Sequence, residues 1–271
     1  MPGRRAGSPA ERGRGVASEA EILFGLHPIL EAIESGRRTI ERILVAREGG
    51  GAGLGRLLRL AREGGVPVTH VPREALARKA GRGAVHQGVA AIVSAMPYAD
   101  AEALCREAVG DPEALLVVLE GVEDPRNLGA VVRTAAAAGA SGVLVPAERS
   151  VGLTPAVAKA SAGALERIGV AREPRLRRRL ESLREAGFRL LALESSGDRS
   201  WDRLDLSGRN VVVAGGEGRG LRPELGALCS HRISIPLERG VESLNVSVAV
   251  AVVLYEIVRQ RRGRQGGPKG R

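Results

Sequence analysis

Apolar residues recur along the chain at two spacings, which predict strands alternating with helices. Short β-branched runs at residues 115–122 and 210–217 are typical of buried strands. Between such runs, residues 128–140 and 154–168 carry apolar positions at helical spacing. Strands that alternate with helices in this way indicate βαβ crossovers and a parallel sheet. The pattern therefore predicts an α/β fold.

Two alternating units are separated by a more polar stretch with one short helical pattern, and both ends of the chain lack apolar periodicity. The predicted order is a disordered basic arm at 1–20, a small α/β domain at 21–95, a linker at 96–113, a larger α/β domain at 114–262 and a disordered basic tail at 263–271. The small domain is expected to begin with a helix within residues 22–36, where Pro28 suits a helix start. Further strands are predicted at 39–47, 66–71, 88–94, 142–146, 188–195 and 232–237, and further helices at 54–65, 73–81, 177–187, 223–229 and 243–262.

The last predicted helix is apolar on nearly every side from Val246 to Leu254. A helix that is apolar all round is expected to be buried all round. Little chain remains to cover it, so a second subunit is one natural partner. Burial within the same domain is the other interpretation, and both stay open.

The charge balance indicates a polyanionic partner. The formal net charge is +10, and nucleic acid is the partner that such a charge attracts most readily. A general drift of the source proteome towards Arg would produce the same composition. Aromatic residues make up only 2%, so binding should depend on phosphate contacts and RNA shape more than on base stacking. Arg175 to Arg179 form either an RNA surface or a solvated helix face.

Several classes of protein are disfavoured by the sequence. Cys105 and Cys229 lie far apart, and the four histidines are scattered, so neither a disulfide framework nor a metal site is predicted. We find no apolar run that could span a membrane, and the N-terminal stretch lacks the apolar core of a secretory signal. A cytoplasmic location is expected.

A glycine cluster follows the predicted strand in VVVAGGEGRGL, residues 211–221. A phosphate-binding P-loop needs Gly-Lys-Ser/Thr after its glycines, and here Arg219, Gly220 and Leu221 follow. The dinucleotide pattern Gly-x-Gly-x-x-Gly is absent, and Pro223 stands where its helix should already run. A nicotinamide-dependent oxidoreductase is therefore disfavoured, although an adenosine-containing cofactor remains compatible with the glycines.

Two other segments carry polar residues where strands lead into helices. In the segment 120–146, Asn127 either caps a helix or contacts a ligand, and Arg133 is either a solubilising residue or a charge aimed at a pocket. In the segment 233–256, Ser243 and Asn245 lead into the apolar last helix. Backbone N–H groups at a helix start also bind polar ligand atoms.

These three segments together resemble the three motifs of the SpoU branch of the SPOUT RNA methyltransferases. The stretches DPRNLGAVVRTA, VVVAGGEGRGL and ISIPLERGVESLNVSVAVAVVLYE match them in order and spacing. FGLHPILEAI and VHQGVAAIV are similar to the small ribosomal-protein-like domain of members that methylate guanosine in 23S rRNA. The resemblance implies an α/β domain with a C-terminal trefoil knot, S-adenosylmethionine as cofactor, a homodimer, and large-subunit rRNA or a ribosome assembly intermediate as substrate.

The resemblance also implies roles for individual residues. The expected catalytic residues are Asn127, Arg133, Glu217, Ser243 and Asn245, and the expected cofactor-binding residues are Leu193, Gly215, Gly216, Gly218, Gly220, Ile235, Leu237 and Leu244. The reaction would be a direct displacement by the ribose 2′-oxygen. Since a guanidinium stays protonated, a bidentate phosphate clamp suits Arg133 better than proton removal.

Other functions are also compatible with the sequence. One is 2′-O-methylation of tRNA or of another rRNA site, as in antibiotic-resistance members of the branch. Another is a non-catalytic RNA-binding assembly factor.

Overall fold

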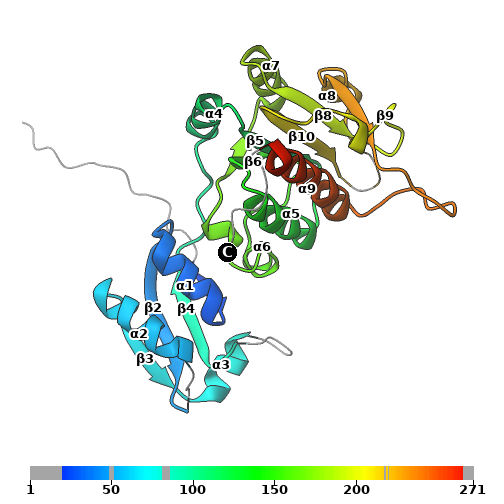
Figure 1. The fold of residues 1–271 in the computed structure, drawn as a ribbon. Helices are drawn as coiled ribbons and strands as arrows, with labels where there is room; N and C mark the ends of the chain where they lie inside the picture. The colour runs from blue at the N-terminus through cyan, green and yellow to red at the C-terminus, as the bar shows by residue number, and fades with distance from the viewer. Residues whose placement is uncertain (1–19, 49–51, 81–85, 217, 219, 265–271) are drawn as a thin grey trace, which may run out of the picture.

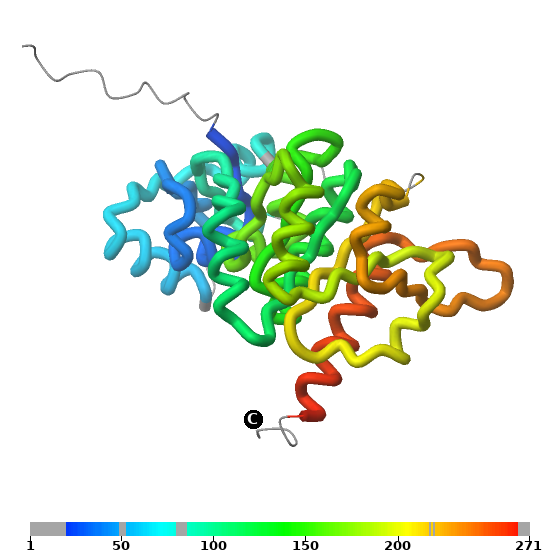
Figure 2. The backbone as a smooth tube through the Cα atoms, turned by 90° about the horizontal axis from the view of Figure 1, so that it is seen from above, coloured from blue at the N-terminus to red at the C-terminus, as the bar shows by residue number. Residues whose placement is uncertain are grey.

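The computed structural model describes residues 20–48, 52–80, 86–216, 218 and 220–264, and every statement on the fold refers to these residues (Figure 1). They form two α/β domains that lie side by side, with the N-terminal domain at one end of the molecule (Figure 2). The predicted basic arm and tail fall almost wholly outside the described residues. The α/β fold class is confirmed, and a small α/β domain precedes the larger one as expected.

The N-terminal domain is a mixed four-stranded sheet in the order β1-β4-β2-β3, covered by helices on both faces. Ile43 and Val45 of β2 belong to the core beneath α1 and α2, while Leu44 and Ala46 pack with Leu76 of α3. Successive strand residues point to opposite faces, which explains this division. The elements are β1 (Glu21–Phe24), α1 (Leu26–Ser35), β2 (Ile40–Ala46), α2 (Ala52–Glu63), β3 (Val68–Val71), α3 (Arg73–Ala80) and β4 (Val89–Val93).

The start of this domain differs from the prediction of a helix within residues 22–36. Its first residues form β1, which pairs antiparallel with β4, and α1 begins only at Leu26. Gly25 separates the two with a φ of 93°, a conformation that glycine adopts without strain. The Leu26 N–H donates to Gln87 Oε1 at 3.0 Å, so this backbone group at the helix start is satisfied from outside the helix.

The larger domain is built on seven strands that pair in parallel, in the order β7-β6-β5-β10-β8-β11-β9. Apolar residues of α5, α6 and α9 pack on one face, and those of α4, α7 and α8 pack on the other. The elements are α4 (Ala101–Gly110), β5 (Leu115–Glu120), α5 (Pro125–Ala137), β6 (Gly142–Pro146), α6 (Pro155–Ala160), η1 (Ala164–Glu166), β7 (Val170–Glu173), α7 (Leu176–Glu185), β8 (Arg189–Leu193), β9 (Arg199–Ser200), η2 (Trp201–Arg203), β10 (Asn210–Gly215), α8 (Pro223–Gly226), β11 (His231–Ser234) and α9 (Val246–Arg264).

Three local expectations were wrong or incomplete. The helix predicted over residues 154–168 is interrupted, because Ala162 and Gly163 both have positive φ, 49° and 90°. Strand β7 was not predicted. Helix α5 begins at Pro125 and is capped by Asp124, whose carboxylate accepts from the Arg126 N–H at 2.7 Å. Asn127 therefore lies inside the first turn, and the helix cap is Asp124.

Helix α9 is buried on one side only within this chain. Val250, Val253 and Leu254 are buried, whereas Val248 and Tyr255 are about half exposed at 49% and 51%. The expectation that this helix is covered all round is thus not met by its own domain. Among the described residues, no helix is both long enough and apolar enough to cross a membrane.

Candidate active site

The strand order reverses between β5 and β10, and the polar motifs follow these two strands. Strands β6 and β7 continue the sheet on one side of β5, while β8, β11 and β9 continue it beyond β10. In open α/β sheets, ligands bind outside the carboxyl ends of the strands at such a switch point. Glu120 and Gly215, the last residues of β5 and β10, are register partners there. The site is therefore expected at this edge.

A cavity of about 570 Å³ opens at this edge, and we call it the glycine-lined cavity. Its walls come from the ends of β8 and β10, the loop after β10, and the segment that leads from β11 into α9. All eight residues expected to bind the cofactor line it, namely Leu193, Gly215, Gly216, Gly218, Gly220, Ile235, Leu237 and Leu244. Ser243 lines it as well.

Glycines in this loop are required by close backbone contacts. A Cβ on Gly216 would lie 1.8 Å from the carbonyl oxygen of Gly121, and one on Gly215 would lie 2.1 Å from the carbonyl carbon of Gly220. Gly218 and Gly220 also have positive φ, 87° and 63°. The loop after β10 therefore folds back on itself and against the loop after β5, leaving backbone groups free to approach a ligand. Glu217, in the middle of this loop, lies outside the described residues.

A second and larger cavity of about 1030 Å³ lies next to the first, and we call it the loop cavity. The two cavities share Gly216, Gly220 and Val246. The loop cavity is lined by residues after β5, β6 and β7, including Asn127 and Arg149, and by the start of α7. Two adjoining cavities at one sheet edge can hold two reactants side by side.

Asn127 and Asn245 bring the first and third motifs together at this edge. The Asn245 side-chain N–H donates to Asn127 Oδ1 at 3.0 Å, across 118 residues of sequence. Asn245 Oδ1 accepts from the Ser247 N–H at 2.9 Å and so caps α9. Asn127 is largely buried at 8% exposure, whereas Asn245 and Ser243 are exposed. One amide thus ties α5 to α9, and the polar groups beside it remain accessible.

Arg133 is not brought to these cavities within this chain. It lies on α5 but lines neither the glycine-lined nor the loop cavity, and its side chain is exposed. Helix α5 buries Leu128, Val131 and Val132 on its other sides. Arg133 can therefore reach a ligand only from the outer face of α5.

Two carboxylates at strand ends were not predicted as part of the site. Glu120, buried at the end of β5, forms an ion pair with Arg222 and accepts from the Arg222 N–H at 3.1 Å. Glu194, next to the end of β8, accepts from Arg232 Nε at 2.8 Å. Each follows directly on an apolar strand run, LLVVLE or LLALE, and that position at the carboxyl end was the available signal. Both fix the walls of the cavities.

Neither a thiol of lowered pKa nor a cluster of metal-ligating side chains is found among the residues that the structure describes. Burial raises the pKa of the Cys229 thiol to about 12, with Glu194 adding to the effect, so this group is a protonated thiol at neutral pH. The described residues contain no group of three or more His, Cys, Asp or Glu side chains that could hold a metal ion. The arrangement suits transfer between two bound reactants, with side chains that orient them.

Comparison with known proteins identifies the class. Residues 114–255 match the model of the SpoU rRNA Methylase family, and residues 22–99 match the model described as RNA 2′-O ribose methyltransferase substrate binding. The chain is an RNA 2′-O-ribose methyltransferase with a substrate-binding domain ahead of its catalytic domain. It belongs to the SpoU rRNA methylase family, as its three motifs predicted.

Individual relatives agree with this assignment. An uncharacterized tRNA/rRNA methyltransferase of Mycobacterium avium (strain 104) is 41% identical over 260 residues, covering 96% of this chain and 84% of the relative. The SpoU methyltransferase AviRb of Streptomyces viridochromogenes, solved with AdoMet, is 26% identical with a TM-score of 0.75, and 92% of each chain is covered. S-adenosylmethionine is thus the cofactor of the family and of this enzyme, which confirms that prediction.

A second solved structure that is similar to this chain is shorter than it. It is described as showing 2-OH methylation of C/U34 on tRNA, and it is 31% identical with a TM-score of 0.52. It covers 57% of this chain, although all of that structure is covered. The part of this chain without a counterpart there is as large as the N-terminal domain and the segment that follows it.

Proposed function

We propose that this enzyme methylates the ribose 2′-oxygen of a guanosine in large-subunit rRNA, as an enzyme of the RlmB type. The observation that carries the proposal is the substrate-binding domain ahead of the catalytic domain, since the tRNA-related structure covers only 57% of this chain. The net charge of +10 suits a large folded RNA. The substrate is either free rRNA or a ribosome assembly intermediate, and the enzyme is expected in the cytoplasm.

The glycine-lined cavity is proposed to hold S-adenosylmethionine. Its apolar walls, formed by Leu193, Ile235, Leu237 and Leu244, suit the faces of an adenine ring, and the backbone around Gly215 to Gly220 suits its polar edges. The cavity volume of about 570 Å³ is in the range of cofactor sites. When bound, the cofactor supplies an electrophilic methyl group on a sulfonium. We propose that the chain threads through the trefoil knot here, since the loops after β8, β10 and β11 border one cavity.

The target ribose is proposed to bind where the two cavities meet. Ser243 lines one cavity, Asn127 lines the other, and Asn245 bonds to Asn127. Orienting the 2′-hydroxyl towards the methyl group supplies a large share of the rate. Arg133 is assigned to the phosphate beside that ribose, as a bidentate clamp. The proton of the hydroxyl leaves to a substrate phosphate or to water, because a guanidinium cannot accept it.

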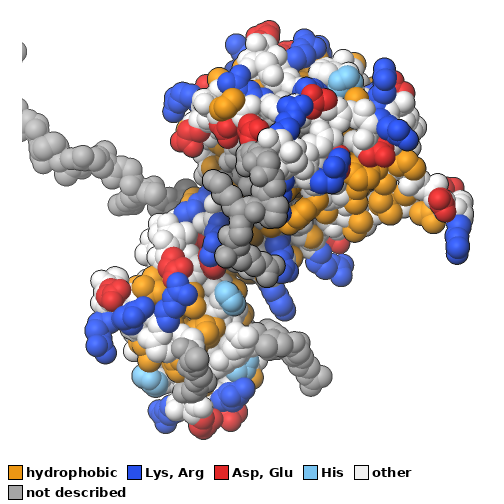
Figure 3. Space-filling model, viewed as in Figure 1, with side chains coloured by type: hydrophobic (Ala, Val, Ile, Leu, Met, Phe, Trp, Pro, Cys, Tyr) orange, Lys and Arg blue, Asp and Glu red, His pale blue; other side chains and the backbone are white. Residues whose placement is uncertain are grey.

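A homodimer is part of the proposal. Figure 3 shows hydrophobic side chains gathered over the N-terminal part of α9 and the segment before it. The exposed members are Val241, Leu244, Val248 and Tyr255. A second copy that covers this face would bury the open side of α9. Such a copy would also bring another Arg133 near the open cavities, since α5 packs against α9.

RNA is proposed to contact the N-terminal domain and the basic start of α7. Within Arg175 to Arg179, the charges are not equivalent. Arg179 is held by Glu173 and Glu102, both at 2.8 Å, and serves the fold. Arg175 and Arg178 line the loop cavity, and no ion pair of theirs is seen among the described residues. These two are the better candidates for phosphate contacts.

The test is label transfer from methyl-labelled S-adenosylmethionine to unmodified large-subunit rRNA, to precursor particles and, separately, to tRNA. After alkaline digestion, label in resistant dinucleotides from the ribosomal substrates alone is expected. Label in tRNA instead would move the assignment to the tRNA branch. RNA binding without label in any substrate would favour an assembly factor.

A further inference from the structure

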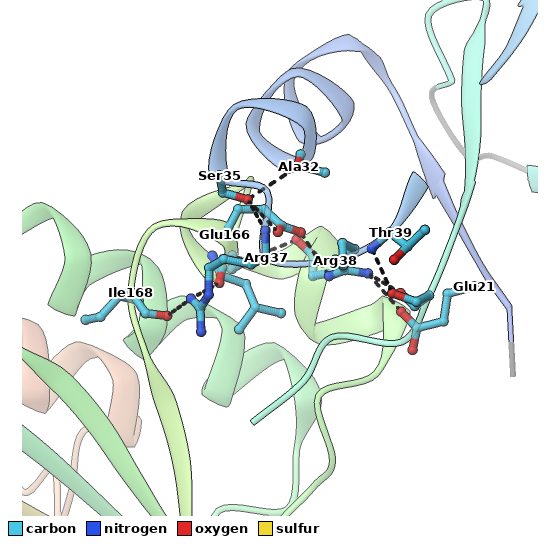
Figure 4. Close-up of polar contacts among 12 residues, drawn as sticks. Glu21, Ala32, Ser35, Arg37, Arg38, Thr39, Glu166 and Ile168 are labelled. Carbon is cyan, nitrogen blue, oxygen red and sulfur yellow. Dashed lines mark hydrogen bonds and ion pairs between the residues drawn. The ribbon is translucent and has the colours of Figure 1, made fainter. Parts of the chain in front are cut away.

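The N-terminal domain contacts the catalytic domain through a cluster of charged side chains that we call the domain junction. It lies between α1, the turn after it and η1, and none of its residues lines either cavity. Figure 4 shows its side chains converging from the two domains. The junction consists of Glu21, Glu31, Ser35, Arg37 and Arg38 from the N-terminal domain and of Glu166 and Arg167 from the catalytic domain.

Arg38 is the centre of the junction. Its Nη1 lies 3.1 Å from Glu21 Oε2 in its own domain, and its Nη2 lies 2.9 Å from Glu166 Oε1 in the other. The Arg38 side chain is fully buried, and that of Glu166 is 3% exposed. Burial raises the pKa of the Glu166 carboxyl, which Arg38 opposes. A cation thus joins carboxylates of both domains in a place that water does not reach.

Arg37 and Ser35 add hydrogen bonds to the same segment. Arg37 Nη1 donates to the carbonyl oxygens of Leu165 at 3.1 Å and Ile168 at 2.6 Å. Ser35 Oγ donates to Glu166 Oε2 at 3.3 Å. Carbonyls at the end of a helical turn carry partial negative charge, so a guanidinium suits them. These bonds have direction, and they fix the turn after α1 against η1.

An exposed pair and an apolar core complete the junction. Arg167 donates to both oxygens of Glu31, at 2.5 and 2.6 Å. One apolar core cluster runs through both domains and includes Ile29 as well as Leu165 and Ile168. Hydrophobic contact gives the docking its affinity, because it is non-directional and proportional to area. The charged groups then determine the angle between the two domains.

The segment between the domains is also held. The Ala99 N–H donates to the Val170 carbonyl at 2.8 Å, which extends the sheet beyond β7. Tyr98 accepts from Arg172 Nη2 at 2.9 Å, and the same guanidinium lies 4.5 Å from the ring centroid. The chain therefore leaves the N-terminal domain along a fixed path.

We propose that the junction docks the substrate-binding domain in one orientation, with Arg38 and Glu166 as positioning residues for the methyl transfer. Domains joined by a linker move relative to one another unless their interface is extensive. A buried ion pair adds little net stability, but any other docking angle would leave a buried charge unpaired. The junction therefore selects one angle out of those that the apolar contact would allow.

The functional consequence rests on the proposed function. If the N-terminal domain binds one element of a folded RNA, fixed docking places a single ribose at the cavities and rejects its neighbours. The substrate class is therefore an RNA long enough to contact both domains at once. A short oligonucleotide that reaches only the catalytic domain gains nothing from the junction.

The variant that opens the junction is Glu166→Lys, which places a cation beside Arg37 and Arg38. The matched control is Glu107→Lys, the same charge change at an exposed position of α4. A milder pair is Arg167→Glu and its rescue by Glu31→Arg, which exchanges the two charges of one ion pair. This pair keeps the test decisive if Glu166→Lys fails to fold.

The first measurement is single-molecule FRET between dyes on Arg59→Cys in α2 and Arg184→Cys in α7, both exposed positions. Burial raises the pKa values of Cys105 and Cys229 to about 11 and 12, so at neutral pH the dyes attach to the introduced thiols. Labelled chains are mixed with excess unlabelled chains, so that a dimer carries one labelled copy. A single narrow distribution is expected for wild type and Glu107→Lys, and a broad one for Glu166→Lys.

The second measurement compares kcat/KM on a structured rRNA domain with kcat/KM on a short oligonucleotide. For Glu166→Lys, kcat/KM on the structured RNA is expected to fall about tenfold or more, through a higher KM. This variant should also methylate neighbouring riboses. Its kcat/KM on the oligonucleotide should stay unchanged. Arg167→Glu should lose less, and Glu31→Arg should restore it.

The proposal is overturned by a broad FRET distribution in the wild type. It is also overturned if a folded Glu166→Lys variant keeps a narrow FRET distribution and methylates the same ribose as the wild type. The same result for Arg167→Glu would overturn it as well. If the wild type docks rigidly but methylates no RNA, the proposed function fails while the fixed docking stands.

Discussion

The domain junction and the carboxyl edge of the large sheet use polar residues in opposite ways. At the junction, Arg38 and Glu166 are buried and form an ion pair within the chain. At the sheet edge, Ser243 and Asn245 are exposed, and so is Arg133 on the outer face of α5. Buried paired charges fix a geometry, whereas exposed polar groups are accessible to a ligand. The difference separates residues that position the RNA from residues that act on it.

The largest effect on methylation is expected from Arg133→Ala, which removes one of the exposed polar side chains. Loss of a phosphate clamp should lower kcat/KM for RNA by about 10²-fold or more, because misplacement of the ribose alone costs that much. S-adenosylmethionine affinity should not change, since Arg133 lines neither cavity of its own chain. Steady-state methylation and isothermal titration measure the two quantities.

Arg133→Lys and Arg106→Ala sharpen this result. Lys keeps the charge without the bidentate geometry, so kcat/KM of Arg133→Lys should stay well below the wild-type value. Arg106 is an exposed Arg of α4, and its removal should have little effect. Near-normal activity of Arg133→Lys with unchanged RNA affinity would contradict the bidentate clamp.

A smaller effect is expected from Gly216→Ala at the contact between two loops. The added Cβ would meet the Gly121 carbonyl oxygen at 1.8 Å, so one loop must move. Overpacking of this kind costs about 1–3 kcal/mol, and about 1.4 kcal/mol corresponds to a tenfold change in affinity. Calorimetry should show S-adenosylmethionine binding weakened about tenfold or more.

The matched control for that change is Gly55→Ala in α2, where an added Cβ meets nothing within 4 Å. Cofactor affinity should be unaffected there. Equal affinity of Gly216→Ala and wild type would show that the loop adapts, and that the glycine-lined cavity does not depend on this close contact.

Asn245 allows stability and activity to be separated. Asn245→Ala removes the cap of α9, which costs about 1 kcal/mol, or roughly 2–4 °C in Tm for a domain of this size. Asn245→Ser keeps a capping oxygen, but its shorter side chain lacks the amide N–H that reaches Asn127. The Ser variant should therefore melt near wild type and still lose methylation. Full activity of the Ser variant would place Asn245 in the fold alone.

The smallest effect is expected at an ion pair that belongs to neither region. In α9, Arg259 donates to both oxygens of Glu256 at 2.7 Å and holds the pKa of that carboxyl below its usual value of 4.5. A lowered carboxyl pKa adds stability above pH 4.5, and this is lost as the pH falls further. Glu256→Gln should thus melt slightly below wild type at neutral pH.

The pH dependence is the decisive part of that experiment. The difference in Tm should shrink as the pH falls below 4.5, because the wild-type carboxyl is then protonated as well. Thermal melts across this range measure it. A difference that is constant with pH would mean that Gln disturbs the packing of α9 and not its charge.

Much of the sheet edge could be predicted because its signals are local and repeated. All eight expected cofactor residues line one cavity, because seven of them lie in the second and third motifs and Leu193 ends another strand of the same parallel sheet. Their binding roles remain predictions. Of the two alternatives for Asn127, capping is wrong, because Pro125, directly after Asp124, sets the start of α5.

The domain junction could not be predicted from the sequence in the same way. Arg38 and Glu166 are 128 positions apart, and neither stands in a motif. Glu166 is turned towards Arg38 by the break at Ala162 and Gly163, where positive φ values end α6 in the middle of a helical pattern. Gly163 is a local signal of that break, but the sequence does not show that Glu166 then faces Arg38. An ion pair between two residues that are far apart in the sequence can be recognised only once the tertiary fold is known.

The most direct test of the central claim is to map 2′-O-methyl groups in RNA from cells that lack this enzyme. One ribose of large-subunit rRNA is expected to lose its methyl group, with tRNA unchanged, and the wild-type enzyme but not Arg133→Ala should restore it. Intact methylation of large-subunit rRNA together with a methyl group missing from tRNA would contradict the claim.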